Sequence, residues 1–119
     1  MVSALDPKYL PIFSVLERAG FTCSVDDYRP DVFGNFVVLS STPTARIKAT
    51  NDRGQVFVAI AKASGPWTDK ETMLENLGVP RARHETKEGL WSGYDPAAQA
   101  AELELFLPRL LAAANNGAA

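Results

Sequence analysis

The sequence has little of the residue chemistry on which many small secreted or metal-dependent domains rely. Among 119 residues there is one cysteine, Cys23, and one histidine, His84. A single cysteine excludes an internal disulfide and a cysteine-rich zinc site, and secreted domains of this size more often carry several bridges. A zinc site would need further ligands from carboxylates, yet the chain has no His-Glu-x-x-His motif. We therefore expect no metal and no other cofactor.

Long hydrophobic runs and an excess of one charge are also lacking. No window approaches the roughly 18 apolar residues of a membrane span, and the first six residues do not read as a signal peptide. The 12 Lys and Arg residues nearly balance 14 Asp and Glu, for a net charge of −2, so no basic face stands ready to neutralise phosphates. The sequence predicts a cytoplasmic protein that binds neither membranes nor nucleic acid.

What the chain does have is enough apolar residue content for one core. Hydrophobic residues make up 46% of it, and a chain of this length buries roughly two thirds of its unfolded surface in a single core. Alternating apolar residues predict strands over residues 21–26, 32–41, 45–50 and 55–62, with a loop at 27–31. Asn51-Asp52-Arg53-Gly54 fits a type I turn followed by a bulge. In the last strand Val56, Val58 and Ile60 alternate with Phe57, Ala59 and Ala61. Because Ala59 and Ala61 are small, we expect a helix to pack closely on their side of the sheet.

Helix signals flank these strands. Asp6-Pro7 predicts the start of a helix that ends at Gly20, although Pro11 could delay its regular part to about Leu10. A possible capping box, Thr68 to Glu71, precedes a short helix, and Asp95-Pro96 opens a long one that Pro108 should kink. Because the strands follow one another directly, we predict an α+β fold: a mostly antiparallel sheet of about four strands, with these three helices packed on it. We expect residues 1–119 to form one domain.

The inventory of catalytic groups is poor. Ser92 lacks the Gly-x-Ser-x-Gly elbow, and no glycine-rich phosphate loop occurs. His84, with Arg81 and Arg83, could hold an anionic substrate, but the segment mixes both charges without a hydrophobic period, as a solvated loop does. Cys23 is interpreted as a small buried residue rather than a reactive thiol. We predict that the protein is not an enzyme and has no catalytic residues.

Binding residues are easier to nominate. An acidic cluster surrounds one tyrosine, and exposed Tyr and Trp side chains concentrate binding energy at protein interfaces. The acidic residues could hold a cation, but they lack the pattern of an EF-hand loop. Either of the chain's two tryptophans could instead be a core residue. The predicted partner-binding residues are Asp26, Asp27, Tyr28, Asp31, Trp67 and Trp91.

Part of the chain has a succession of strand, turn and helix segments that is similar to a known class of protein. The segments Phe33-Gly34-Asn35-Phe36-Val37-Val38-Leu39, Asp52-Arg53-Gly54-Gln55-Val56-Phe57-Val58, Trp67-x-Asp69 and Met73-Leu74-x-x-Leu77-Gly78 follow one another with Ile47 between the first two. Over residues 33–78 the chain resembles small cytoplasmic immunity proteins of bacterial polymorphic-toxin and contact-dependent inhibition systems. The resemblance implies a non-enzymatic protein that binds one cognate toxin domain and blocks it, and it transfers no binding residue.

Two other classes remain open at this stage. A small-molecule-binding or enzymatic α+β domain would place its pocket between sheet and helices, with Arg81, Arg83 and His84 as candidates. An adaptor or chaperone for a secreted effector would also bind a protein, but it would leave the partner's activity intact. A metabolite-dependent rise in melting temperature would indicate the first of these two classes.

Overall fold

The protein is an α+β domain, as predicted, in a computed structural model that describes residues 2–79 and 94–116. Its strands are β1 (Thr22–Arg29), β2 (Asn35–Ser41), β3 (Ala45–Asp52), β4 (Gln55–Lys62) and the two-residue β5 (Thr68–Asp69). Its helices are α1 (Leu10–Arg18), α2 (Lys70–Asn76) and α3 (Pro96–Asn115), and two short 3-10 turns, η1 (Val2–Ala4) and η2 (Pro7–Tyr9), precede α1.

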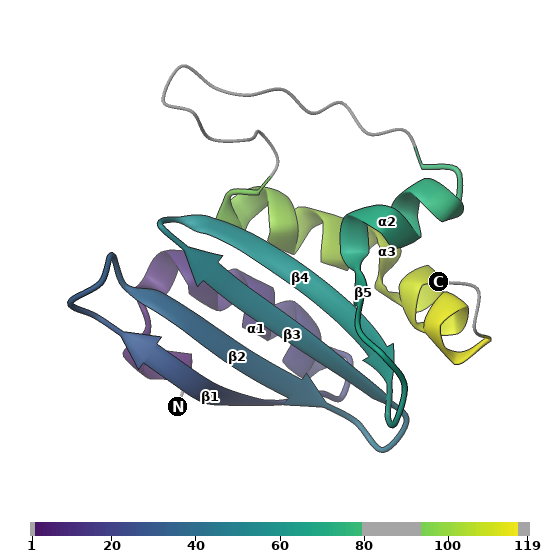
Figure 1. Cartoon of the computed structure of the whole chain (residues 1–119), viewed down its shortest axis with the longest axis horizontal. Helices are drawn as coiled ribbons and strands as arrows, with labels where there is room; N and C mark the ends of the chain where they lie inside the picture. The colour runs from purple at the N-terminus through teal and green to yellow at the C-terminus, as the bar shows by residue number, and fades with distance from the viewer. Residues whose placement is uncertain (1, 80–93, 117–119) are drawn as a thin grey trace.

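The strands form one antiparallel sheet in the order in which they occur along the chain, β1-β2-β3-β4-β5. Helices α1 and α3 lie side by side behind the sheet in Figure 1, on the same face, and α2 follows β5 at the sheet's far edge. In the described part of the chain, the opposite face of β1 to β4 therefore has no helix on it.

The core lies between that sheet and the two long helices. Alternate residues of the three central strands are buried on this side, because the side chains of a strand point to opposite faces with a period of two. From β3 these include Ile47 and Ala49, and from β4 Val58 and Ile60. The helices contribute Ile12, Phe13, Leu16, Leu103, Leu107 and Leu110. Their recurrence at three or four residues places them on one face of each helix.

The predicted helix starts are confirmed at both ends of the chain. The Asp6 carboxylate accepts a hydrogen bond from the Lys8 amide at 3.0 Å and caps η2, after which α1 begins at Leu10 with Pro11 in its first turn. The Asp95 carboxylate accepts from the Ala98 amide at 3.2 Å and caps α3. Pro108 lies inside α3, which changes direction between its green and yellow parts in Figure 1.

Several predicted boundaries were wrong around the β1–β2 connection. The predicted loop at 27–31 is strand as far as Arg29, because a β-bulge between Val25 and Asp27 accommodates Asp26 and lets pairing continue. The next strand begins at Asn35 rather than at residue 32. Phe33 and Gly34 have positive φ values of 54° and 66°, which turn the chain and exclude them from β2.

The β3–β4 connection and the start of α2 also differ from prediction. Asp52 pairs with Gln55, so the loop is only Arg53 and Gly54, whose φ values of 53° and 88° are those of a type I′ turn rather than type I. The capping box does not form: Asp69 is the N-cap residue of α2 without a side-chain cap bond, and Thr68 belongs to β5.

The predicted helix over Ala59 and Ala61 is also wrong. The helices pack on the face of Val56, Val58 and Ile60, which buries more apolar area than the alanine side offers. On the other side, Phe57 stacks on Tyr94 with ring centroids 4.8 Å apart and remains 36% exposed. The strand considered for residues 89–92 lies outside the described residues.

Candidate partner-binding surface

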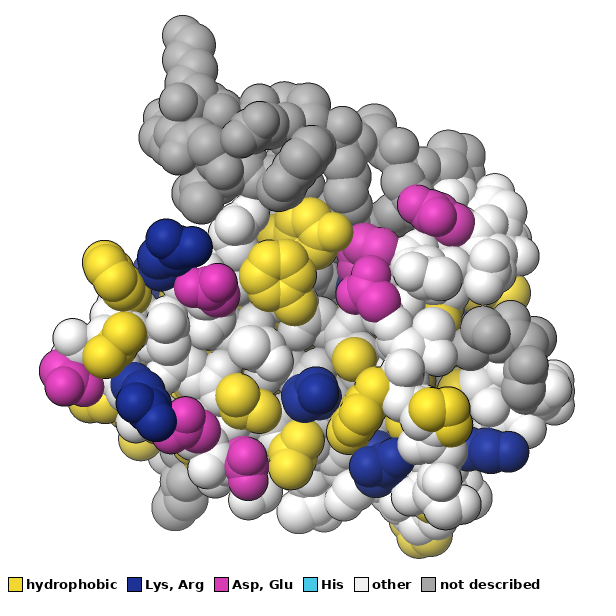
Figure 2. Space-filling model, viewed as in Figure 1, with side chains coloured by type: hydrophobic (Ala, Val, Ile, Leu, Met, Phe, Trp, Pro, Cys, Tyr) yellow, Lys and Arg dark blue, Asp and Glu magenta, His cyan; other side chains and the backbone are white. Residues whose placement is uncertain are grey.

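The face of the sheet turned away from α1 and α3, here called the open face, presents side chains in rows that follow from the strand register. One row runs Asp27, Val37, Thr50, Phe57 from β1 to β4, and the next runs Ser24, Leu39, Lys48, Ala59. A third runs Thr22, Ser41, Arg46, Ala61. Figure 2 shows this face: hydrophobic side chains gather over the middle of the sheet with basic side chains among them.

The apolar members of the open face are only partly covered. Leu39 is 38% exposed and Phe57 36%, while Val37 is half-buried. A large apolar side chain that stays partly exposed on a flat sheet keeps area that a second surface can bury. These residues therefore mark the open face as the described surface best suited to a protein partner.

Trp67 lies on this same face, between β4 and β5. The Arg46 guanidinium carbon is 4.5 Å from the centroid of its ring, and the Lys48 ammonium nitrogen is 4.9 Å from it. Since Arg46 and Lys48 are alternate residues of β3, both belong to the open face by register. The prediction that Trp67 contributes to a binding surface is compatible with its half-buried position there.

The predicted acidic residues lie at the opposite edge, on β1 and in the turn after it. Asp26, Asp27 and Asp31 are exposed, and the Asp27 carboxylate pairs with the Arg29 guanidinium at 3.2 Å. Asp27 lies on the open face, opposite Val37. The structure thus places Asp27 and Trp67 on one face, with β2 between Asp27 and the β3 residues that Trp67 contacts.

Tyr28 is located differently from its acidic neighbours. It lies opposite the buried Phe36 and packs against the core from the helix side of the sheet. It also lines a shallow hollow of about 260 Å³ with Tyr9 and Phe33, and Phe33 is 74% exposed. Tyr28 therefore does not share a face with Asp27.

Sequence reasoning missed Leu39, Phe57, Arg46 and Lys48 as surface residues of interest. Their signal was the strand alternation itself, which places each of them on the face opposite the buried residues. What the alternation does not show is which of the two faces the helices cover. Trp91, Arg81, Arg83 and His84 lie outside the described residues.

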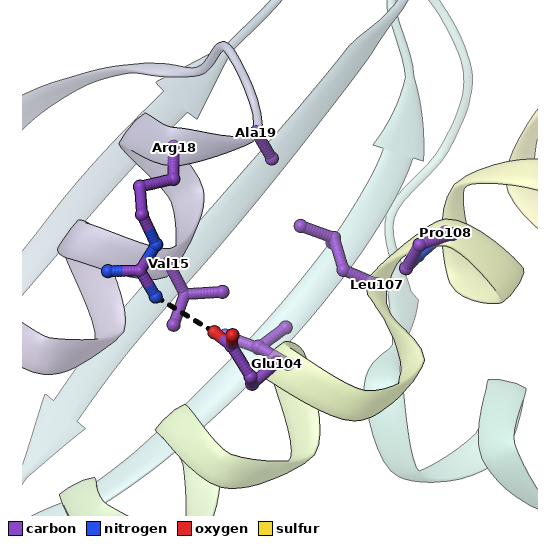
Figure 3. Close-up of a pocket in the computed structure, with 7 residues that line it drawn as sticks. Val15, Arg18, Ala19, Glu104, Leu107 and Pro108 are labelled. Carbon is purple, nitrogen blue, oxygen red and sulfur yellow. Dashed lines mark hydrogen bonds and ion pairs between the residues drawn. The ribbon is translucent and has the colours of Figure 1, made fainter.

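In the described part of the chain, the hollow between the two long helices offers little for a ligand. It has a volume of about 200 Å³ and lies in the groove between α1 and α3, where Figure 3 shows the Arg18 and Glu104 side chains meeting across it. Their ion pair is 2.9 Å long and exposed at both ends. The remaining walls are aliphatic, among them Val15 and Leu107. Such a groove supplies no convergent set of buried polar groups to fix a ligand.

The hollow of about 360 Å³ at one end of the open face is more polar. The side-chain amides of Asn35 and Asn51, which line it, form hydrogen bonds with the backbone of the neighbouring turns. Asn51 donates from Nδ2 to the Gly34 carbonyl at 3.1 Å and accepts from the Gly54 amide at 3.0 Å, and Asn35 accepts from the Arg53 amide at 2.8 Å. Because these hydrogen bonds use the amide groups, the hollow is better described as a turn scaffold than as a reaction site.

Cys23 and the acidic side chains are the remaining candidates for a reactive group or for metal ligands. Burial raises the pKa of the Cys23 thiol, and the Ser40 hydroxyl, which donates to its sulfur at 3.0 Å, opposes that effect only in part. A thiol with a raised pKa is a poor nucleophile at neutral pH. Within residues 2–79 and 94–116, no three His, Cys, Asp or Glu side chains come together as metal ligands.

Comparison with known proteins adds no assignment. No family model, no curated protein and no solved structure matches this chain significantly. In the described part, no helix combines the length and the hydrophobicity needed to cross a membrane.

Proposed function

We propose that this protein is an immunity protein that binds a cognate bacterial toxin domain and neutralises it by stoichiometric occlusion. The observation that carries the proposal is the open face, where Leu39 and Phe57 stay more than a third exposed on a five-stranded antiparallel sheet. The resemblance of residues 33–78 to immunity proteins supports the kind of partner. A preformed surface suits tight inhibition, because little conformational entropy is lost on binding.

The acidic edge supports the same function through charge. Asp26, Asp27 and Asp31 contribute three negative charges, of which Arg29 pairs with that of Asp27. Toxins that act on polyanions need a basic cleft, and an acidic edge complements such a cleft and speeds encounter with it. Trp67 supplies an aromatic group on the same face, of the type that concentrates binding energy at interfaces.

Identification of the partner comes first. The tagged protein is used to capture its partner from native cells, and the captured domain is assayed for activity at increasing ratios of the protein. An immunity protein abolishes the activity at one equivalent. A stable complex whose activity is intact would identify an adaptor instead, and a capture that stays empty while the partner locus is expressed would turn attention to metabolite binding.

Charge reversal then tests the acidic edge. In the test variant Asp26, Asp27 and Asp31 all become Lys; the matched control makes the same change at Glu17, Glu75 and Glu104, which are exposed helix residues. We expect the test variant to bind the toxin domain about tenfold more weakly or worse, with a smaller salt dependence, and the control to bind nearly as the parent does. Equal affinity of all three across a salt series would contradict this role.

A further inference from the structure

Trp67 and two basic side chains form a compact group on the open face, here called the Trp67 clamp and made of Arg46, Lys48 and Trp67. Both cations lie within 5 Å of the ring centroid, at 4.5 and 4.9 Å. The Arg46 Nη2 atom also donates to the Gly65 carbonyl at 2.6 Å, and its Nε atom is buried without an acceptor. The guanidinium is therefore held in place by the backbone and by the ring, not by an anion.

The partners of Arg46 and Lys48 differ from those of three other arginines. Arg18, Arg29 and Arg53 each meet a carboxylate at 2.9 to 3.2 Å. In the described ranges, neither Arg46 nor Lys48 forms an ion pair with a carboxylate. Two adjacent cations that share one aromatic ring repel each other, and an incoming carboxylate would relieve that repulsion.

Apolar side chains adjoin the clamp. Lys48 lies between Leu39 and Ala59 in its row, and Phe57 follows in the neighbouring row. Figure 2 shows the basic side chains set among hydrophobic ones over the middle of the sheet. A charge contact made beside apolar area is desolvated when a partner covers it, which strengthens the contact.

We propose that the open face receives an extended acidic segment of the protein partner, whose carboxylates at alternate positions bind Arg46 and Lys48 beside the apolar Leu39 and Phe57. Residues two apart on a strand are spaced about 6.7 Å. An extended segment with acidic groups at every second position has the same repeat. This inference rests on the proposed function, because it names the chemistry of the partner that the immunity protein binds.

The charge distribution favours a protein over a nucleic acid. Asp27 and Asp69 occupy rows of the same face, and the whole chain carries a net charge of −2. A continuous phosphate backbone would meet these acids as well as the clamp, whereas a protein segment can place carboxylates only where the cations are.

The test uses Trp67 as its own reporter. Trp91→Phe leaves Trp67 as the only indole, because the chain has two tryptophans. The fluorescence and the indole N–H resonance of the full chain are then followed during titration with short peptides in which valine alternates with glutamate, with glutamine or with lysine. We expect the glutamate peptide to bind about tenfold more tightly than the glutamine peptide, and the lysine peptide not to bind.

Variants locate the contact. Lys48→Gln and Arg46→Gln should each reduce affinity for the glutamate peptide about fivefold to tenfold. The double substitution Lys8→Gln, Arg53→Gln removes two exposed charges elsewhere and should change it little. Urea unfolding verifies that each variant folds; Lys48→Gln keeps the test valid should Arg46→Gln fail to fold, since Lys48 makes no hydrogen bond among the described residues.

Three results would overturn the proposal. The first is equal affinity for the glutamate and glutamine peptides. The second is tighter binding of oligothymidylate, which would identify a nucleic-acid surface. The third is self-association of the parent protein that Lys48→Glu abolishes, which would show that a second copy covers this face. The titration contains no toxin domain, so a negative titration contradicts the acidic-segment proposal without contradicting the immunity function. A negative immunity assay, in turn, does not change the result of the peptide titration.

Discussion

The side chain of Gln99 forms a hydrogen bond with the backbone of Val56, at the edge of β4 that faces away from β3. Gln99 Nε2 donates to the Val56 carbonyl at 2.7 Å, and the Val56 amide donates to the Tyr94 carbonyl at 2.6 Å. Strand β5 pairs with β4 at Ala59 and Ile60, so within residues 2–79 and 94–116 Val56 has no strand neighbour on that side. The start of α3 thus satisfies backbone groups that would otherwise be buried without partners.

Replacing Gln99 tests this connection. Gln99→Leu keeps the size of the side chain but leaves the Val56 carbonyl without its donor, and the expected loss is about 1–3 kcal/mol of unfolding free energy. Leu105→Ala, on the same helix but 71% exposed, should change it by less than about 0.5 kcal/mol. Urea unfolding measures both. A loss for Gln99→Leu no larger than that of the control would show that this bond is dispensable.

Lys70, the first residue of α2, anchors a buried ionic cluster directly after β5. Its ammonium lies 2.8 Å from Glu71 Oε1 and 2.5 Å from Glu102 Oε1, and the side chain is fully buried. Lys70→Met removes the charge that these two carboxylates share, and we expect a loss of about 3–5 kcal/mol in unfolding free energy. Arg18→Met, which breaks the exposed pair with Glu104, should cost at most about 1 kcal/mol. Similar losses for both would mean that burial does not govern the strength of these pairs.

Local patterns explain why some of the fold could be predicted and some could not. Asp6-Pro7 and Asp95-Pro96 act within one helical turn, so the sequence determines them directly. The extension of β1 depends on a bulge at Asp26 and on pairing with β2, contacts that no local pattern contains. Thr68 loses its expected cap role because it pairs with Ile60 in the sheet. Tertiary pairing overrides local preference in both places.

The candidate surface shows the same division. Asp26, Asp27 and Trp67 could be nominated from residue type alone, since acids and tryptophan are conspicuous in sequence. Arg46 and Lys48 look like the ordinary solvated side of a strand until the register places them beside Trp67. That juxtaposition depends on how the chain returns after β4, for which no short-range signal exists.

The β3–β4 turn offers a pair of substitutions with opposite signs. Gly54 has φ 88°, and a Cβ atom there would meet nothing within 4 Å, so Gly54→Ala tests the backbone alone. We expect it to lower the unfolding free energy by about 1–2 kcal/mol. Arg53, at φ 53°, is a poor residue for a type I′ turn, in which Asn is preferred. Arg53→Asn should therefore raise the unfolding free energy by about 0.5 kcal/mol. Thermal unfolding of the two variants checks both signs, and a neutral Gly54→Ala would contradict the type I′ geometry.

Cys23 should make stability depend on pH in the alkaline range. Burial is the main cause that raises the pKa of its thiol in the folded state, with a smaller contribution from Glu17 in the same direction. The unfolded chain then loses the thiol proton first, near its ordinary pKa of about 8.5. Stability from this group is therefore fully present below that pH and falls as the pH rises toward the folded-state pKa.

The measurement is urea unfolding of the parent and of Cys23→Ala between neutral pH and the onset of lysine and tyrosine titration. The parent should lose unfolding free energy above pH of about 8.5, relative to the variant, whose own curve records every other titrating group. The same burial predicts slow reaction of the native thiol with a disulfide reagent at neutral pH, and fast reaction in urea. Parallel pH curves for the two proteins, or a native thiol that reacts as fast as the unfolded one, would show that Cys23 is not desolvated, and that the sheet edge between β1 and α1 opens more readily than its packing indicates.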